Sequence, residues 1–498
     1  MNAHNGMNGA GAHGDSCATG HTSCCESAKT SCSTMAKPGR DWEMEMQGYE
    51  PKAHYDFVVI GAGPAGTTFA QLMADAGNSV LLLEAAKYPR FAVGEIIAPT
   101  GIWRVWSKLG ITREELDSQF IRKWNGGWQA PTGEVFNFEQ DVFPDDPVCE
   151  AFVYSFDRSV YDYFLLNKAR EHGVIGLDEA KVEDVLYDDT GRMNGVKFTR
   201  QGKTHEVRCK LVVDSSGRVN FLARKLGLRM DIDKLRSIST FAHWEGAKRN
   251  AGRAEGDVRI VYQKDMWFWW APLKGDKVSI GIVANRDVYA DEYYQDPTAF
   301  YDKYVWTCPF IADRIKDGAK KLTNFKPAIA NKGTGGSELH GYHFYSKQLA
   351  GNGWVIVGDA AGFIDPIFSA GLYIVHESAA NLAEKLIADM KMNNGEVKME
   401  PLMEYQETYF KQFREILSHI QQFATYYFDP KFTSFFVKLG NSRPRFRQLY
   451  INTFVAYDPE AIREYSKFLQ SRFKFRGDEF GKEEIIDDVE SNATMAKG

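Results

Sequence analysis

Residues 55–84 constrain the fold of this chain more than any other stretch. They begin with Phe57 to Ile60, a short apolar run of the kind found in buried parallel strands. Gly61, Gly63 and Gly66 follow in GxGxxG spacing. The first glycine of this pattern permits a tight turn, the second lets a pyrophosphate approach the backbone, and the third lets the next helix pack closely on the strand. The stretch therefore predicts a phosphate-binding loop.

The rest of this unit indicates a dinucleotide ligand. A helix expected over residues 64–76 would present free N–H groups and a positive dipole end to the phosphates. A second strand, expected over residues 79–83, ends at Glu84, whose carboxylate is placed to accept hydrogen bonds from a ribose. A glycine turn in an ordinary βαβ unit does not account for Glu84, so we predict a Rossmann-like dinucleotide-binding domain.

The composition is that of a globular protein that binds neither nucleic acid nor a membrane. The 498 residues suffice for two or three domains, and 44% of them are hydrophobic and 25% charged. A formal net charge of −6 offers no broad basic surface to nucleic acid, and no apolar stretch is long enough to span a bilayer. The polar, glycine-rich N-terminus does not resemble a secretion signal, so we expect a cytoplasmic protein.

The seven cysteines are unevenly placed. Four lie in the first forty residues near two histidines, and either a metal site or a disordered tail would explain the group: Cys17, Cys24, Cys25, Cys32, His13 and His21. No pair among the four cysteines has the CxxC spacing of a zinc site, so we favour the tail and predict no metal. Cys149, Cys209 and Cys308 are typical of reduced thiols in a cytosolic protein.

Pattern changes along the chain predict an α/β fold combined with an antiparallel sheet and C-terminal helices. Strands and loops alternate over residues 235–345, which indicates an antiparallel sheet and not continued βαβ winding. The expected order is a disordered Cys/Gly/Ser-rich tail (1–50), a nucleotide-binding domain (54–230, with an inserted hairpin near 120–140), an antiparallel-sheet substrate domain (235–345), the last part of the nucleotide-binding domain (346–395), a helical region (396–480) and a loose acidic tail (481–498).

Three segments together resemble the FAD-binding pattern of the class A flavoprotein monooxygenase superfamily: GAGPAG with Glu84, VVDSSGR at 212–218, and WVIVGDAAGFIDPIFSAG at 354–371. The resemblance implies that the dinucleotide is FAD and that it is bound by Gly61, Gly63, Ala65, Gly66, Glu84, Arg158, Gly358, Asp359, Pro366 and Gly371. Asp359 follows a buried strand, where a carboxylate can accept hydrogen bonds from ribityl hydroxyls. It could also be a helix N-cap, and both roles can hold at once. For Arg158 the alternative is a surface salt bridge.

A tryptophan-rich strand resembles a motif of the flavin-dependent halogenases. Trp267, Trp269 and Pro272 in MWFWWAPL match the halogenase motif WxWxIP, with Ala271 in place of the isoleucine. The resemblance implies that these residues keep the substrate away from the flavin. Taken alone, the segment would be interpreted as an aromatic core strand.

A lysine resembles the catalytic lysine of the same family. Lys123 in FIRKWNGGWQ matches the halogenase motif FxxKxGxxF, although the glycine falls one residue late. A lysine among aromatic residues loses solvation and can serve as a nucleophile or a strong hydrogen-bond donor. The resemblance implies catalysis, and the alternative is a surface lysine whose stem covers apolar residues.

The segment DPIFSAG resembles the halogenase loop that binds halide through backbone N–H groups. Ser369, Ala370 and Gly371 occupy the matching positions, at a loop-to-helix junction where successive N–H groups can hold an anion. Tryptophan halogenases carry a glutamate before the serine, whereas this chain has Phe368. The difference favours the phenol and pyrrole halogenases, whose activated rings need less assistance.

The resemblance covers residues 54–395 and implies a FADH2- and O2-dependent halogenase. Such an enzyme makes hypohalous acid from chloride or bromide at the flavin and halogenates an electron-rich ring through Lys123. The ring would be a phenol or pyrrole, free or tethered to an acyl or peptidyl carrier protein. No second GxGxxG unit is evident for NADPH, so we expect a separate flavin reductase. Two alternatives stay open: an FAD-dependent aromatic monooxygenase or geranylgeranyl-reductase-like oxidoreductase, and a non-catalytic flavin-binding protein.

Overall fold

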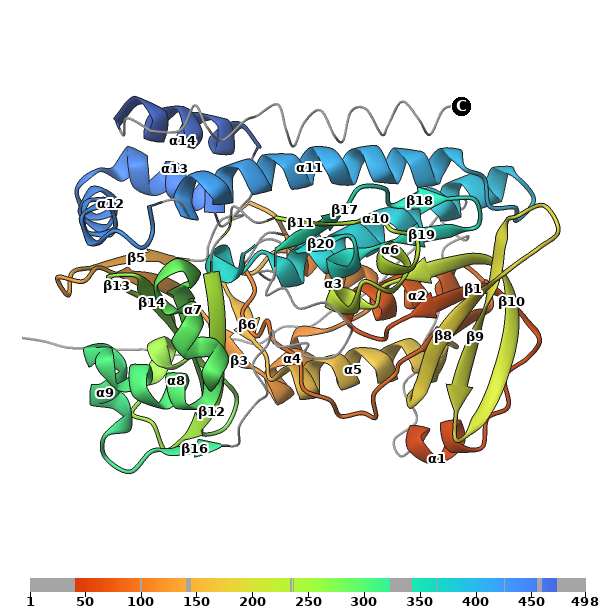
Figure 1. Cartoon of the computed structure of the whole chain (residues 1–498), viewed down its shortest axis with the longest axis horizontal. Coiled ribbons are helices and arrows are strands. Elements are labelled where there is room, and N and C mark those ends of the chain that lie inside the picture. Colours follow the sequence, from red (N-terminus) through yellow and green to blue (C-terminus); the bar gives the residue numbers. More distant parts are fainter. Residues whose placement is uncertain are drawn as a thin grey trace, which may run out of the picture. The chain divides into compact units, whose positions relative to one another are not determined.

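A mixed sheet of eight strands is built around β1 (His54–Ile60), the strand predicted from the first apolar run (Figure 1). β2 (Val80–Leu83) and β10 (Lys203–Asp214) pair with β1 in parallel, one on each side. β7 extends the sheet in parallel beyond β2, β19 does so beyond β10, and β8, β9 and β18 pair in antiparallel fashion. Their bounds are Ile175–Leu177 (β7), Ala180–Tyr187 (β8), Met193–Arg200 (β9), Ala350–Gly351 (β18) and Trp354–Ile356 (β19).

The computed structural model describes residues 41–98, 101–139, 145–232, 235, 237–322, 343–363, 365–424, 426–454 and 459–472. The N-terminal cysteines and the acidic tail at 481–498 lie outside the described residues. Helix α1 (Trp42–Gln47) falls within the stretch that was expected to be a disordered tail. It is ordered because Trp42 and Met46 are buried one turn apart and because Arg200 donates a hydrogen bond to the Met46 carbonyl at 2.7 Å. The ordered chain thus begins before His54.

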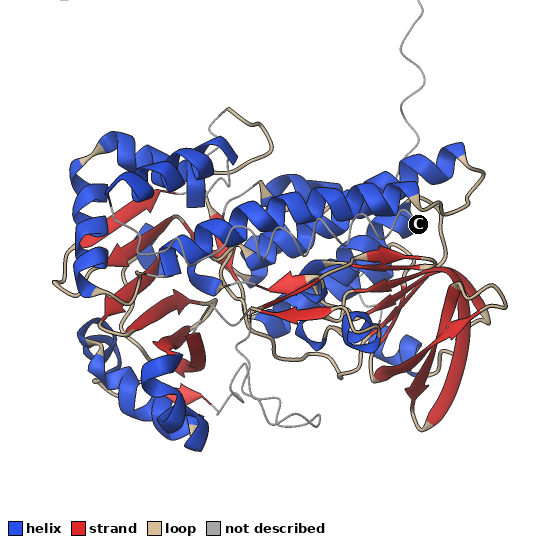
Figure 2. Ribbon diagram, turned by 45° about the horizontal axis from the view of Figure 1, so that its top comes forward, coloured by secondary structure: helices blue, strands red, loops and turns tan. Residues whose placement is uncertain are grey.

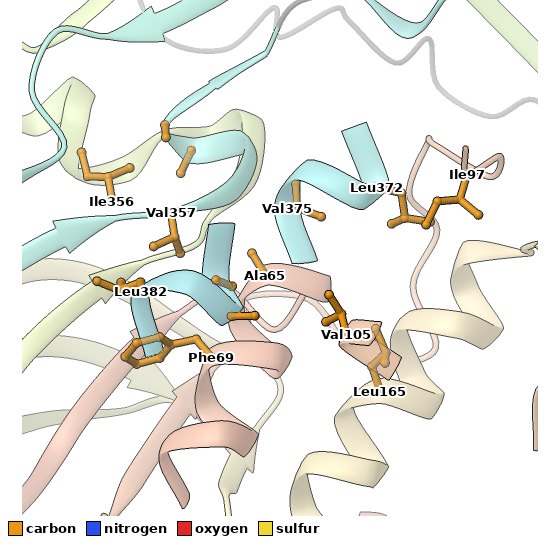
Figure 3. Close-up of a cluster of buried hydrophobic side chains, with 14 of the residues drawn as sticks. Ala65, Phe69, Ile97, Val105, Leu165, Ile356, Val357, Leu372, Val375 and Leu382 are labelled. Carbon is orange, nitrogen blue, oxygen red and sulfur yellow. The ribbon is translucent and has the colours of Figure 1, made fainter. Parts of the chain in front are cut away.

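Helices α2 (Pro64–Asp75) and α10 (Gly371–Met392) pack against each other beside this sheet. Figure 3 shows Ala65 and Phe69 of α2 directed toward Val375 and Leu382 of α10, and all four side chains are buried. The helix that follows the glycine turn is therefore held by a helix from much later in the chain. The other helices of this part are α3 (Ile102–Lys108), α4 (Arg113–Gln119), α5 (Arg158–Glu171) and α6 (Phe221–Lys225).

A second sheet has seven strands in the order β16-β12-β15-β14-β13-β4-β5. All neighbours are antiparallel except β13 and β4, which are parallel. The hairpin expected near 120–140 is β4–β5, and it joins this sheet rather than the sheet around β1. The bounds are Asn125–Gln129 (β4), Val135–Glu139 (β5), Ser237–Glu245 (β12), Val258–Gln263 (β13), Met266–Pro272 (β14), Lys277–Asn285 (β15) and Lys320–Leu322 (β16).

Three helices replace the alternation of strands and loops expected over the later part of residues 235–345. They are α7 (Arg286–Gln295), α8 (Pro297–Tyr304) and α9 (Pro309–Ile315). Their apolar residues, including Tyr293, Phe300 and Ile311, form a second core with Phe268 and Trp270 of β14. The start signals are present in the sequence: Asn285 and Asp296 cap α7 and α8, and prolines open α8 and α9.

Four C-terminal helices confirm the helical region expected after the FAD-binding segments. Figure 2 shows that helices lie beside both groups of strands. They are α11 (Glu400–Ala424), α12 (Pro430–Ser442), α13 (Pro444–Phe454) and α14 (Pro459–Arg472). Two small sheets complete the fold: β3 (Ile121–Lys123) with β6 (Val153–Ser155), and β11 (Arg229–Asp231) with β17 (Phe344–Ser346) and β20 (Gly362–Phe363). In the described part of the chain, no helix has the length and apolar character needed to cross a membrane.

Truncating Phe69 tests the contact between α2 and α10. The side chain is 0% exposed, so we expect Phe69→Ala to lower the free energy of unfolding by about 3–5 kcal/mol, the usual cost of removing a buried phenyl ring. Urea denaturation followed by tryptophan fluorescence would measure the change. Val288→Ala, at a residue that is 53% exposed, is the control and should stay within about 0.5 kcal/mol of the parent. Equal effects of the two substitutions would contradict this packing.

Candidate active site

A cavity of about 910 Å³ lies at the carboxyl ends of β1, β2 and β10. Ligands bind at this edge of open α/β sheets, and the volume lies at the upper end of ordinary ligand pockets, as a dinucleotide requires. Most of the predicted site residues line it: Gly61, Gly63, Ala65, Glu84, Arg158, Trp267, Trp269, Asp359, Pro366, Ser369, Ala370 and Gly371. Among the described residues, Gly66, Gly358, Pro272 and Lys123 do not belong to its lining. Segments far apart in the sequence therefore meet at one cavity.

The three glycines of the turn have different roles. Gly61 has a φ of +96°, and a Cβ there would lie 2.6 Å from the carbonyl oxygen of Ser215. A Cβ on Gly66 would lie 2.0 Å from the carbonyl oxygen of Gly61. Gly63 has an ordinary backbone, and a Cβ there would meet only the tip of Arg90, at 3.6 Å. The fold itself thus requires Gly61 and Gly66, whereas Gly63 leaves space at the cavity wall.

A buried ion network joins the end of β2 to α5 at the cavity wall. Arg90 contacts Glu84 Oε2 at 3.1 Å and Asp162 Oδ2 at 3.0 Å. Arg158 donates to the same Asp162, at 2.7 Å from Nε, and to the Val93 carbonyl at 2.7 Å. Arg158 is 9% exposed, so its interpretation as a surface salt bridge is wrong. Sequence analysis missed Arg90 and Asp162, although the i, i+4 spacing of Arg158 and Asp162 was an available signal.

Gly358 and Asp359 follow β19 in a short 3-10 turn. Gly358 has a φ of +61°, and a Cβ there would lie 2.7 Å from the Cβ of Ala65, so glycine lets α2 approach this turn. Asp359 lines the cavity, and burial raises the pKa of its carboxyl to about 6 against the attraction of two nearby arginines. The N-cap position of the turn is Val357, so the cap interpretation of Asp359 is wrong.

The N-terminus of α10 borders the cavity through Ser369, Ala370 and Gly371. Ser369 has a φ of +56°, which turns the chain into the helix, and in the described part of the chain no side chain caps this end of α10. The first N–H groups of a helix have no partner within the helix, and the dipole makes this end positive. The loop and the helix start together can hold an anion.

β14 presents Trp267 and Trp269 to the cavity, because alternate residues of a strand share one face. The Trp269 indole N–H donates to Ser279 Oγ at 3.1 Å. Gly281 on β15 makes room for this indole, since a Cβ there would lie 2.1 Å from the ring. The same alternation places Pro272 on the opposite face of the strand, so the structure does not bring it to the cavity with the tryptophans.

Lys123 ends β3 and is 4% exposed, so its interpretation as a surface lysine is wrong. Its amine donates a hydrogen bond to the carbonyl of Ile97. Burial lowers the pKa of this amine to about 7, and attraction to Asp257 opposes the shift. A second cavity, of about 40 Å³, adjoins the lysine, and apolar and aromatic residues including Trp128, Phe138 and Tyr450 line it.

The lysine cavity and the large cavity share three lining residues, Ile96, Ile260 and Ser369. A backbone hydrogen bond also connects them, since the Ala98 N–H donates to the Ser369 carbonyl at 3.3 Å. Ala98 directly follows the residue whose carbonyl holds the lysine. Sequence analysis missed this role of residues 96–98, because only tertiary contacts place them between the two cavities.

Phe368, the residue before Ser369, lines the lysine cavity. Its ring packs near Trp128 and Phe423, with centroid separations of 5.9 and 5.2 Å. No acidic residue is present among the described residues that line this cavity. A substrate ring in this place would therefore be surrounded by apolar and aromatic side chains and one amine.

The C-terminal helices supply further walls that sequence analysis did not assign. α11 lines the large cavity with Tyr409, Phe413, Ile416 and Ile420. Their spacing of four, three and four residues places them on one helix face, and this apolar periodicity was a usable signal. α13 adds Tyr450 to the lysine cavity.

The fold and this site define a flavin-dependent halogenase. A model of the tryptophan halogenase family matches residues 145–432, and a model of FAD-dependent oxidoreductases matches residues 56–225. Because the first match spans more than half of the 498 residues, the chain belongs to the tryptophan halogenase family. The resemblance drawn from the sequence is confirmed, and the enzyme uses FAD and a halide.

Relatives and solved structures agree with this assignment. A pyrrole-2-carbonyl–peptidyl-carrier-protein brominase of Pseudoalteromonas luteoviolacea is 29% identical over 67% of this chain and 77% of the relative. The corresponding chlorinase of Pseudomonas fluorescens is 26% identical over 68% and 77%. The structure of a flavin-dependent brominase matches this chain with a TM-score of 0.69 at 26% identity. The match covers 84% of this chain and 100% of the brominase chain. A geranylgeranyl bacteriochlorophyll reductase-like protein, at 17% identity and a TM-score of 0.62, shares the fold alone.

The glycine turn yields a paired prediction. Gly63→Ala should fold normally but bind FAD more weakly, because its methyl group enters the space where a pyrophosphate approaches the backbone. Gly66→Ala should instead lower the melting temperature without flavin, because its Cβ overlaps the Gly61 carbonyl. Thermal unfolding without FAD and titration with FAD would separate the two effects. A destabilised Gly63→Ala protein would contradict the open space seen at that residue.

The buried amine of Lys123 predicts a dependence of stability on pH. The pKa falls from 10.5 to about 7 on folding, so the unfolded chain binds more protons between these values and stability rises with pH across this window. Lys123→Met removes this contribution. The unfolding free energy of the parent minus that of the variant should therefore increase by about 3–5 kcal/mol from pH 7 to pH 10.5. Urea denaturation at several pH values would measure it, with exposed Lys391→Met as the control. A difference that does not vary with pH would show that the amine is not desolvated.

Proposed function

We propose that this halogenase acts on an electron-rich aromatic ring, a phenol or pyrrole held on a carrier protein, and that Lys123 delivers the halogen. The observation that carries the proposal is the position of the lysine. Its buried amine, with a pKa near 7, lies beside a cavity that shares Ser369 with the large cavity. A near-neutral amine in apolar surroundings suits a nucleophile or a hydrogen-bond donor at physiological pH.

The large cavity fits FAD on three observations. The turn at Gly61, Gly63, Ala65 and Gly66 offers an uncapped helix start for the pyrophosphate, Glu84 has a carboxylate at the end of β2 for the ribose, and Asp359 adjoins Gly358 at the cavity wall for the ribityl chain. Arg158, Pro366 and Gly371 complete the proposed FAD contacts. When bound, reduced FAD would supply two electrons to O2, which takes two more from the halide, so that hypohalous acid, water and oxidised FAD result.

The protein residues hold the halide and separate it from the ring. Backbone N–H groups at Ala370 and Gly371 would bind chloride or bromide at the positive end of α10. The N–H of Ser369, the third residue expected to bind halide, already donates to the Pro366 carbonyl at 3.0 Å. Trp267 and Trp269 occupy the cavity wall, where they exclude a substrate ring from the flavin. Pro272 can contribute only by fixing the end of β14, because it lies on the other face of the strand.

The surroundings of Lys123 favour a ring that is already activated. The amine would accept the electrophilic halogen as a chloramine, or orient hypohalous acid by donating a hydrogen bond, and in either case it faces the ring. Phe368 leaves no carboxylate at the position where a tryptophan halogenase has one. A phenol or pyrrole does not need that carboxylate, since its own heteroatom donates electrons to the ring.

A tethered substrate is supported by two observations. Two relatives are named for pyrrole-2-carbonyl groups on peptidyl carrier proteins. The lysine cavity, at about 40 Å³, has room for a few water molecules but is well below the roughly 150 Å³ of a cavity that binds benzene, so a ring must displace wall side chains such as Phe138 or Tyr450 to enter. The binding energy of a carrier protein could support this displacement. A separate flavin reductase and a cytoplasmic location stay predictions.

Mass spectrometry of a substrate panel tests the proposal. Phenols and pyrroles, free and carrier-bound, would be incubated with the protein, FAD, a flavin reductase, NADH, O2 and bromide. We expect a bromine isotope doublet on a carrier-bound ring, and its loss by at least about a hundredfold in Lys123→Ala, as is typical when a catalytic acid–base or nucleophilic group is removed. FAD binding and peroxide release should be retained.

The outcomes separate the alternatives. Retained bromination by Lys123→Ala would remove the lysine from the mechanism. A hydroxylated product would favour the monooxygenase, and reoxidation of reduced flavin without any modified ring would favour a non-catalytic flavoprotein. Lys391→Ala, on the exposed end of α10, is the matched control and should leave bromination unchanged.

A further inference from the structure

Residues 431–447, which span most of α12 and the start of α13, carry five basic side chains and no acidic one. We name as the basic face the exposed side chains of Lys431, Lys438, Arg443, Arg445 and Arg447. Phe435, which is 44% exposed, lies on the same side of α12 as the two lysines, because residues three and four apart share a helix face. This local positive charge contrasts with the formal net charge of −6 for the whole chain.

Within the described ranges of the chain, most of the charge on the basic face is not neutralised. Among the residues that the structure describes, none forms an ion pair with Lys431, Lys438 or Arg443. Arg445 pairs with Glu464 at 3.0 Å, but 90% of its side chain is exposed. Arg447 lies over the ring of Phe136 and donates to a β5 carbonyl at 2.8 Å, so it anchors α13 to the hairpin. The three cations Lys431, Lys438 and Arg443 thus face solvent, beside a phenyl ring that is partly exposed.

The basic face covers the outer wall of the lysine cavity. α12 lies beside β5 and β13, as Figure 1 shows, and a Cβ on Gly440 would lie 2.7 Å from the Phe136 ring. From the same helices, Tyr450 lines the lysine cavity, and Phe436 packs against Trp128, another lining residue, with centroids 5.6 Å apart. A partner bound here would therefore lie next to the side chains that must move when a ring enters.

We propose that the basic face is the docking surface of an acidic carrier protein, whose phosphopantetheine arm passes beside α13 to present an aromatic acyl group to Lys123. The inference rests on the proposed tethered substrate. The arm carries a phosphate at the carrier surface, and the guanidinium of Arg443 has the geometry for bidentate hydrogen bonds to phosphate. The two lysines meet the acidic surface of the carrier, and Phe435 supplies apolar contact.

The size and composition of the basic face favour this partner over nucleic acid or a membrane. The surface combines a few cations with one exposed aromatic residue, whereas nucleic-acid surfaces extend a basic stripe over many phosphates. Its place beside the lysine cavity also matches a ligand that must deliver a ring. A flat membrane could not reach this buried amine.

The test compares two substrates in one charge-reversed variant. Lys431→Glu/Lys438→Glu/Arg443→Glu would be assayed with the carrier-bound ring identified by the panel above and with the same acyl group on pantetheine alone. We expect KM for the acyl-carrier to rise about tenfold or more, with a weaker salt dependence, because charge complementarity at the edge of an interface governs association. Turnover of the pantetheine thioester and the affinity for FAD should stay unchanged.

The matched control reverses three other exposed lysines, Lys52, Lys320 and Lys391, and so makes the same change in net charge. It should leave both substrates unaffected. If KM for the acyl-carrier rose equally in this control and in the charge-reversed variant, the effect would come from net charge alone. That result would overturn the docking surface.

The remaining outcomes distinguish this inference from the proposed function. If the parent halogenates the acyl-carrier and the variant does so equally well, the docking surface is wrong and the proposed function stands. If the parent halogenates only free rings, both the tethered substrate and the docking surface fail. If the charge-reversed variant had an unchanged KM but a lower melting temperature, the basic face would bind the acidic residues 478–490 of the same chain. If the oligomeric mass changed, the basic face would bind a second copy of the chain. Either result overturns the proposal.

Discussion

The close approach of α2 to the end of β1 positions the rest of the site. It depends on Gly66, which has no Cβ to collide with the Gly61 carbonyl. The approach places the start of α2 beside the turn at Gly358, and α10 then packs along α2. The N-terminus of α10 carries Ser369, whose carbonyl binds the segment that holds the lysine amine. The positions of the residues at both cavities therefore depend on the absence of a Cβ at Gly66 and Gly358.

Burial without full charge compensation sets the chemistry of the two cavities. It lowers the pKa of the Lys123 amine to about 7 and raises that of the Asp359 carboxyl to about 6. Desolvation acts in opposite directions on an ammonium and a carboxylate, because it disfavours whichever form is charged. Desolvation therefore brings the pKa values of both groups close to physiological pH. In the ion network around Arg158, by contrast, the charges at the cavity wall are paired.

The C-terminal helices join the two parts of the site. α11 lines the large cavity with one apolar face, and α13 lines the lysine cavity with Tyr450. α12 packs behind the lysine cavity through Phe436, which contacts Trp128, and both α12 and α13 present cations to solvent. Relatives with carrier-protein substrates match about two thirds of this chain at under 30% identity, so the shared flavin chemistry tolerates wide divergence.

The cofactor-binding unit, the family and a minority of the residues that line the large cavity could be predicted from the sequence. These depend on local constraints, such as glycine at a tight turn, apolar period and the order of short motifs, which neighbouring residues encode directly. Three features could not be predicted from the sequence: Lys123 is buried against Ile97, residues 96–98 lie between two cavities, and Tyr450 forms part of a cavity wall. Such contacts join segments far apart in the chain, and their free energy comes from packing and desolvation, which leave no pattern in any one segment.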